Sequence, residues 1–335
     1  MSLNFDSAIS KFQPEPALQP SCYELYRGNA FEWMAKRDPS SIHAIVTDPP
    51  YGLKEYSEGE KQKLRKGRGG IWRIPPAFDG CKRNPLPRFT VLDAADRAAL
   101  KNFFTEFAEL AKRILVPGGH VLIAANPLLS HLVYLPLIDA GFEKRGEVIR
   151  LVQTLRGGDR PKNAHAEFAD VTVMPRSGWE PWGVFRKPCE GRVQDNLRKW
   201  GTGGLRRVSE SEPFSDVIRS APTRADERSL APHPSLKPQS FMRRIVRAAL
   251  PLGQGVILDP FMGAGSTIAA AFAMGYRSIG IEHDPIYFSV AEKAVPALAQ
   301  YDCSKASSSR AKGSKHVAAS AGSGDGPHPQ LRVFR

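Results

Sequence analysis

Residues 255–282, GVILDPFMGAGSTIAAAFAMGYRSIGIE, restrict the fold more than any other part of this sequence. An apolar run ending at Asp259 precedes a turn with two glycines, an alanine-rich segment and a second apolar run ending at Glu282. We therefore expect a strand, a turn, a helix and a second strand. Short apolar strands joined by helices are typical of a mostly parallel sheet covered by helices on both faces.

The same alternation extends through most of the chain. Besides the strands at 256–259 and 277–282, we expect strands at 42–47, 120–125, 147–154 and 171–174. Helices are expected at 97–115, 128–139, 239–250 and 266–274. The sequence 117–119, Pro-Gly-Gly, is expected to end the first of these helices before the strand at 120–125 begins. The pattern predicts an α/β fold.

The glycine turn has the features of a nucleoside-binding loop. Gly263 and Gly265 let a ligand approach the backbone, because a Cβ would intrude there. Ser266 is placed to cap the following helix, and Gly275 suits the end of that helix. Glu282, at the end of the next strand, is placed to accept hydrogen bonds from ribose hydroxyls.

The residues around this turn argue against a diphosphate ligand. Residues 264–267 contain no lysine, which a P-loop requires, and Ile268 stands where a dinucleotide-binding motif has its third glycine. S-adenosylmethionine has a ribose but no phosphate, so it fits a site that contains a carboxylate. The alternative is a purely structural turn, because tight packing of a helix on a strand would produce a similar sequence.

The tetrapeptide Asp48-Pro49-Pro50-Tyr51 follows the apolar run 42–47 and is the candidate catalytic motif. The amino group of a nucleobase is a poor nucleophile, because its lone pair is delocalised into the ring. Asp48 and a carbonyl of Pro49 or Pro50 could accept its two N–H bonds and offset the charge that develops on nitrogen. Tyr51 offers a flat face to a base rotated out of a duplex. The alternative is a strand end followed by a proline turn.

The charge of the chain favours a polyanionic partner. Lys and Arg number 47 against 34 Asp and Glu, which gives a net charge of +13. Two basic stretches, at about 53–95 and 186–231, interrupt the strand–helix alternation, and we expect them to contact that partner unless they are solvated surface loops. The candidate DNA-binding residues are Arg156, Arg198, Lys199, Arg206 and Arg207.

The two ends of the chain differ from the region between them. Residues 1–20 are expected to form a loose lead-in, and 302–335 a disordered basic tail, which leaves 21–301 as the folded domain. The first twenty residues lack the pattern of a signal peptide, so we expect a cytoplasmic protein. The four cysteines are far apart, and no metal site is expected.

The sequence resembles the DNA amino-methyltransferases, which modify N6 of adenine or N4 of cytosine. The resemblance rests on the tetrapeptide 48–51, on Asp259-Pro260-Phe261-Met262-Gly263-Ala264-Gly265-Ser266-Thr267, and on His233-Pro234-Ser235-Leu236-Lys237-Pro238. The catalytic motif comes first and the cofactor motif last, an order that is similar to the beta group of the family. The match extends over about residues 22–300.

This resemblance implies a seven-stranded, Rossmann-like, mostly parallel sheet in which the strands ending at Asp48 and Asp259 are neighbours. It implies that the stretch before His233, residues 186–231, is the target-recognition region. It also implies cofactor contacts for a set of residues around the glycine turn and beyond it: Asn29, Ser235, Lys237, Asp259, Phe261, Gly263, Gly265, Ser266, Thr267 and Glu282. Asn29 stands where relatives often have an acidic residue.

The function expected from these features is methyl transfer from S-adenosylmethionine to N6 of adenine in double-stranded DNA, with the target base flipped out. An aspartate in the first position of the tetrapeptide favours adenine by resemblance, and cytosine N4 is the alternative. An RNA or protein-glutamine methyltransferase is disfavoured by the motif order, and a catalytically dead DNA-binding protein by the intact motifs. A second copy of the chain and a cognate restriction endonuclease are candidate partners.

Overall fold

A computed structural model describes residues 22–50, 93–152, 160–161, 163–175, 177–233 and 235–304 of the chain. All the described helices and strands belong to one unit, residues 14–301. Of the two predicted basic insertions, most of 53–95 lies outside the described residues, whereas 186–231 contributes two helices and a sheet strand to this unit. The predicted lead-in and nearly all of the predicted tail also lie outside them.

The centre of the unit is a sheet of eight described strands in the order β1-β8-β7-β2-β3-β5-β4-β6. Their bounds are β1 Tyr23–Arg27, β2 Ile42–Thr47, β3 Leu115–Ala124, β4 Glu143–Leu151, β5 Trp179–Arg186, β6 Val217–Arg219, β7 Val256–Asp259 and β8 Arg277–Glu282. Among the described strands, only β5 runs antiparallel to its neighbours. The observed sheet therefore has one more strand than the seven that were expected.

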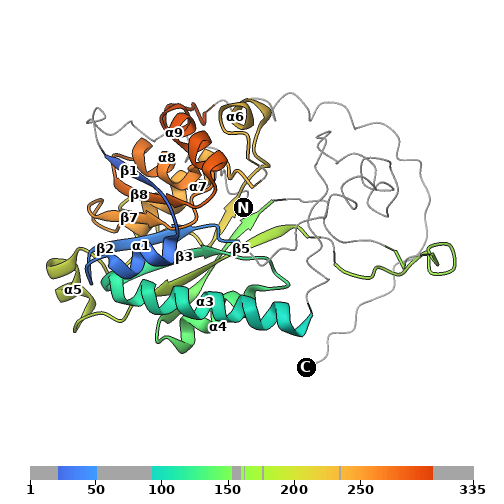
Figure 1. Ribbon diagram of the computed structural model, residues 1–335, viewed down its shortest axis with the longest axis horizontal. Coiled ribbons are helices and arrows are strands. Elements are labelled where there is room, and N and C mark those ends of the chain that lie inside the picture. Colours follow the sequence, from blue (N-terminus) through green and yellow to red (C-terminus); the bar gives the residue numbers. More distant parts are fainter. Residues whose placement is uncertain are drawn as a thin grey trace, which may run out of the picture. The chain divides into compact units, whose positions relative to one another are not determined.

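Helices cover both faces of this sheet (Figure 1). Apolar residues of α1, α3 and α4 pack on one face, where Ile45, Val121 and Ile123 point. Apolar residues of α7 and α8 pack on the other, against Ala44, Val46 and Leu122. The helices are α1 Ala30–Lys36, α3 Ala94–Ile114, α4 Ser130–Asp139, α5 Val193–Trp200, α6 Ala225–Leu230, α7 Gln239–Ala249, α8 Ser266–Ala273 and α9 Pro285–Ala299.

Three of the expected strands differ from those observed. The strand expected at 120–125 already begins at Leu115, and residues 116–119 bulge out between two pairs with β2. The buried side chain of Asn196 donates to Pro117 O at 3.0 Å and holds this bulge. The strand expected at 147–154 runs from 143 to 151. No strand forms at 171–174, where Val171 and Val173 are exposed and have no partner strand in the described sheet.

The sheet has two edges with different contents. The carboxyl ends of β2, β3, β7 and β8 meet at one edge, together with the amino end of antiparallel β5. At the opposite edge, α5 packs against the beginning of β3 through Asn196, and Figure 1 shows this helix beyond the amino ends of the strands. Ligands of open α/β sheets bind at the carboxyl edge. None of the helices in the described part of the chain is long and apolar enough to cross a membrane.

Candidate active site

The two predicted motifs meet at the carboxyl edge of the sheet. Strands β2 and β7 are parallel neighbours, with Ala44 and Ile45 paired to Ile257 and Leu258. The side chain of Thr47 donates to Asp259 Oδ1 at 2.7 Å, although the two residues lie 212 positions apart. Asp48 follows directly after Thr47. The hydrogen bond therefore holds the backbone before Asp48 against β7, the strand that leads into the glycine turn. The expected adjacency of these strands is confirmed.

The glycine turn is held by the carboxylate of Glu282. Glu282 Oε2 accepts from Gly263 N at 2.9 Å, and its Oε1 accepts from Asp284 N at 2.7 Å. Gly263 and Gly265 have φ angles of 53° and 82°, in the left-handed region that other residues rarely adopt. A Cβ on Gly265 would stand 2.5 Å from Val295 Cγ2, so close packing also requires glycine there.

The expectation that Ser266 caps α8 is wrong. Gly265 is the N-cap residue, no side chain among the described residues caps the helix, and Ser266 is its first residue. The left-handed conformation of Gly265 places Ser266 one position too late to act as the cap. The other end is as expected, because Gly275 follows α8 with a φ of 71° and its N–H bonds to Phe272 O at 3.0 Å.

Asp259 is buried beneath the turn. Its Oδ1 accepts from Thr47 and from Phe261 N, the latter at 3.1 Å, and its side chain also bonds with Thr267. Burial raises the pKa of Asp259 to about 6, with a smaller contribution from the charge of Asp48, and the hydrogen bonds only partly oppose this rise. These contacts make Asp259 and Thr267 supports of the turn, and their predicted contact with a cofactor stays a prediction.

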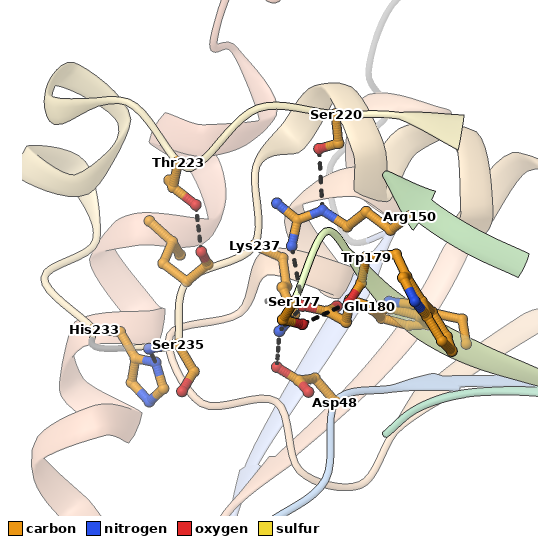
Figure 2. A network of polar contacts seen from close by, with 12 residues as sticks. Asp48, Arg150, Ser177, Trp179, Glu180, Ser220, Thr223, His233, Ser235 and Lys237 are labelled. Carbon is orange, nitrogen blue, oxygen red and sulfur yellow. Dashed lines mark hydrogen bonds and ion pairs between the residues drawn. The ribbon is translucent and has the colours of Figure 1, made fainter. Parts of the chain in front are cut away.

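Asp48 belongs to a network of charged side chains (Figure 2). Lys237 Nζ lies 2.7 Å from Asp48 Oδ2 and 3.4 Å from Glu180 Oε2. Arg150 Nη1 lies 3.2 Å from the same Glu180 oxygen, and Trp182 Nε1 donates to Glu180 Oε1 at 2.8 Å. Burial acts to raise the pKa of Glu180, but Lys237, Arg150 and the bond from Trp182 outweigh it, so that this pKa is lowered.

His233 and Lys237 belong to the segment before α7, which crosses the carboxyl edge. Ser235 N donates to His233 Nδ1 at 3.2 Å, which places the proton of a neutral imidazole on Nε2. That Nε2 faces the glycine turn, because a Cβ built on Gly263 would lie 3.1 Å from it. Burial lowers the pKa of His233, and the charge of Lys237 acts in the same direction, against Asp48 and Asp284.

An aromatic cluster forms the side of the site toward α1 and α3. The ring of Phe261 lies within 6.2 Å, centroid to centroid, of Phe31, Phe103 and Phe107. A cavity of about 290 Å³ opens beside this cluster, and Pro50 of the tetrapeptide lines it together with α3 residues Asp96, Ala99, Leu100 and Phe103. Asn29 uses its side-chain oxygen to cap α1, with Phe31 N at 2.8 Å.

Comparison with known proteins identifies the family. Residues 162–293 match the family model described as DNA methylase. The type II methyltransferase M2.LlaDCHI of Lactococcus lactis subsp. cremoris is 30% identical over 281 residues, which cover 83% of this chain and 90% of the relative. This chain belongs to the N6-adenine and N4-cytosine DNA methyltransferase family. The type II methyltransferase M2.DpnII of Streptococcus pneumoniae is 24% identical over 279 residues, 82% of this chain and 89% of that one.

Solved structures show that this methyltransferase shares its fold with other DNA methylases. The Thermus thermophilus protein TTHA0409, complexed with S-adenosyl-L-methionine, superimposes with a TM-score of 0.51 at 20% identity, covering 84% of this chain and 96% of that one. The cytosine-N4-specific PvuII DNA methyltransferase gives a TM-score of 0.53 at 15% identity, covering 88% and 91% of the two chains. The expected α/β methyltransferase fold is confirmed.

The structure does not bring the four described DNA-binding candidates of the methyltransferase to the catalytic edge. Arg198 and Lys199 belong to α5 at the opposite edge, where they form local pairs with Asp195 and Glu190 at 2.8 and 2.7 Å. Arg206 and Arg207 also lie there, beside the residues that lead into β7 and β8: the Arg206 guanidinium contacts Gly253 and Tyr276, and Arg207 O accepts from Arg247. Tyr51 and Arg156 lie outside the described residues.

Sequence reasoning overlooked Glu180 and Arg150 in the methyltransferase site. The available signal was the stretch 178–185, GWEPWGVF, in which one carboxylate stands among apolar and aromatic residues. Such a charge in a strand-like segment requires a partner. The partner, Arg150, lies on a strand whose position the sequence predicted only approximately.

Proposed function

We propose that this chain is a type II modification methyltransferase that transfers a methyl group from S-adenosylmethionine to N6 of adenine in a specific DNA sequence. The observation that supports the proposal is the hydrogen bond of 2.7 Å between Thr47 and Asp259, which joins the strand before Asp48 to the strand before the glycine turn. A group that binds at the turn would thus lie next to a group held by Asp48. Methyl transfer requires this juxtaposition of donor and acceptor.

The residues around the turn fit S-adenosylmethionine. Each oxygen of the Glu282 carboxylate already accepts one backbone N–H, and each has a second lone pair for a ribose hydroxyl. The turn sequence 264–267 has no lysine to hold a phosphate, while the rings around Phe261 offer an apolar surface to an adenine or a methionine side chain. When bound, S-adenosylmethionine supplies an electrophilic methyl group.

Asp48 and the backbone after it prepare the acceptor amine. The carboxylate and a carbonyl of Pro49 or Pro50 accept the two N–H bonds, which directs the nitrogen lone pair away from the ring. The same acceptors stabilise the positive charge that develops on nitrogen as its bond to the methyl carbon forms and the methyl–sulfur bond of the donor breaks; the nitrogen then loses one of its two N–H protons. Because prolines restrict the backbone, these acceptors need little reorganisation during the reaction. The cavity beside Pro50 gives space next to them.

The carboxyl edge of the sheet is the proposed DNA-facing surface, since a flipped base must reach Asp48 there. The region 186–231 is divided between the two edges: α5 is anchored at the amino edge, while Ser220, after β6, bonds with Arg150 at 3.0 Å at the carboxyl edge. We assign base recognition to the part of this region from β6 onward, with α6 following it.

Two measurements test the proposal. The Asp48→Ala variant should lose methyl transfer by about a hundredfold to a thousandfold and still bind DNA, because one transition-state acceptor is removed. Activity within a few-fold of wild type would exclude Asp48 from the mechanism. Nucleoside mass spectrometry of the methylated DNA should find N6-methyladenine, and N4-methylcytosine alone would show that the base is cytosine.

A further inference from the structure

Two residues, Arg150 and Trp182, hold the Glu180 carboxylate in addition to Lys237. Arg150 and Glu180 are directly paired residues of antiparallel β4 and β5, and their side chains form an ion pair at 3.2 Å. Arg150 also donates to Ser220 Oγ and Ala221 O, each at 3.0 Å. Trp182 holds the second Glu180 oxygen at 2.8 Å. The position of the Glu180 carboxylate is therefore determined by the sheet and not by the catalytic loop.

Lys237 joins this fixed carboxylate to the catalytic one. Its ammonium group lies 2.7 Å from Asp48 Oδ2 and 3.4 Å from Glu180 Oε2, and only 13% of its side chain is exposed. A lysine ammonium is a point charge on a flexible stem, so a single acceptor would not determine its position. The cluster contains two carboxylates, Asp48 and Glu180, and two cations, Lys237 and Arg150, so that its charges sum to zero. Charges that are removed from water require such opposite partners.

We propose that Glu180 is a positioning residue for methyl transfer, which acts on Asp48 through Lys237. Because Glu180 is present, the Lys237 ammonium interacts with two carboxylates instead of with Asp48 alone. Lys237 thus orients Asp48, and Asp48 remains a strong acceptor for the target amine. Without the Glu180 charge, the ammonium binds Asp48 alone and competes with the amine. This role rests on the proposed function of Asp48.

The isosteric variant Glu180→Gln tests the role. We expect the single-turnover rate of methyl transfer to fall by about tenfold to a hundredfold, since small misplacements of a catalytic group have effects of that size. Dissociation constants for S-adenosylmethionine and for DNA should stay within about twofold of wild type, because the proposed role acts on the rate through Lys237 and not on binding.

The pH profile separates positioning from a general loss of structure. Removing the negative charge of Glu180 should move the acid limb of the rate profile to lower pH, because Asp48 then has Lys237 to itself. Lys237→Met removes the cation and should move the same limb to higher pH. Among the described residues, His233 and Asp259 also interact with the charge of Asp48, and both keep their side chains in the two variants, although Lys237→Met also removes a charge that lowers the pKa of His233.

A matched control lies on the same two strands. Glu143 and Arg186 are also directly paired residues of β4 and β5, with an ion pair of 2.5 Å, but at the opposite edge of the sheet. Glu143→Gln should leave the rate and the acid limb at wild-type values. The proposal is overturned if Glu180→Gln behaves like this control, or if both network variants move the limb in the same direction. Asp48→Ala tests the premise independently, since retained methyl transfer there would exclude Asp48 from the mechanism, whereas a wild-type protein that does not methylate DNA would refute the proposed function.

Discussion

We expect replacement of Asp259 by asparagine to change how the stability of the fold depends on pH. Burial raises the pKa of this carboxyl to about 6 in the folded chain, from an ordinary value of 3.8. The folded state thus favours the protonated form. The stabilising contribution is complete below about pH 4 and is lost as the pH rises through about 6. The full difference between the two pKa values corresponds to about 3 kcal/mol.

Part of this change in the free energy of unfolding falls between pH 5 and pH 8, where it can be measured. Proton linkage for this single group predicts that the free energy of unfolding of the wild type falls by about 1.4 kcal/mol between pH 5 and pH 8. Asparagine retains a carbonyl oxygen for Thr47 and Phe261 N but cannot ionise. Urea denaturation of both proteins across this range, followed by circular dichroism, should show the difference between them changing by that amount in favour of the variant as the pH rises.

A second variant tests the direction in which the pKa of Asp259 affects the pH dependence of stability. Thr47→Val removes a hydrogen bond that lowers the pKa of Asp259, so the pH dependence of stability should become steeper than in wild type. A difference between wild type and Asp259→Asn that stays constant from pH 5 to pH 8 would refute the reasoning. The carboxyl would then be ionised in the folded chain over the whole range.

Three further changes have outcomes that the structure predicts. Glu282→Ala should weaken S-adenosylmethionine binding by about tenfold to a hundredfold in calorimetry, since a charged acceptor is lost; near-normal affinity would remove Glu282 from the cofactor site. Combined replacement of Arg198 and Lys199 by alanine should leave the salt dependence of DNA binding unchanged, whereas a slope reduced by about 0.9 per residue would restore them as phosphate contacts. Arg243→Met should lower the free energy of unfolding by about 2 kcal/mol, because its guanidinium donates to three carbonyls at the end of α9, and an unchanged denaturation midpoint would contradict this.

The sequence predicted the bounds of a strand correctly where the local apolar pattern coincides with a strand of the sheet. The strands ending at Thr47, Asp259 and Glu282 have the predicted bounds, because each is a short apolar run closed by a polar residue. By contrast, β5 contains Pro181 and a lone carboxylate, and it forms because β3 and β4 supply partners on both sides. The apolar run 171–174 has the better local pattern but no such partner in the described sheet.

The site was predicted through its motifs and overlooked where contacts are long-range. Asp48 and Gly263 belong to recognisable peptides, whereas Glu180 becomes part of the site only because Lys237 reaches it from another segment. Charge alone could not locate the basic residues in the fold, for a similar reason. The sequence shows that Arg198 is one of several basic residues but not which edge of the sheet carries it, and the structure places it away from Asp48.

The strand order has a consequence for how the enzyme is made. Strands β1 and β2 are synthesised first, but they pair with β8 and β7, which come from the last third of the chain. Pairings between such distant segments must overcome a large loop-closure entropy and tend to form slowly. A growing chain therefore lacks a finished catalytic edge until β7 and β8 have left the ribosome. We expect C-terminally shortened products that end before β7 to be inactive and to require proteolytic removal.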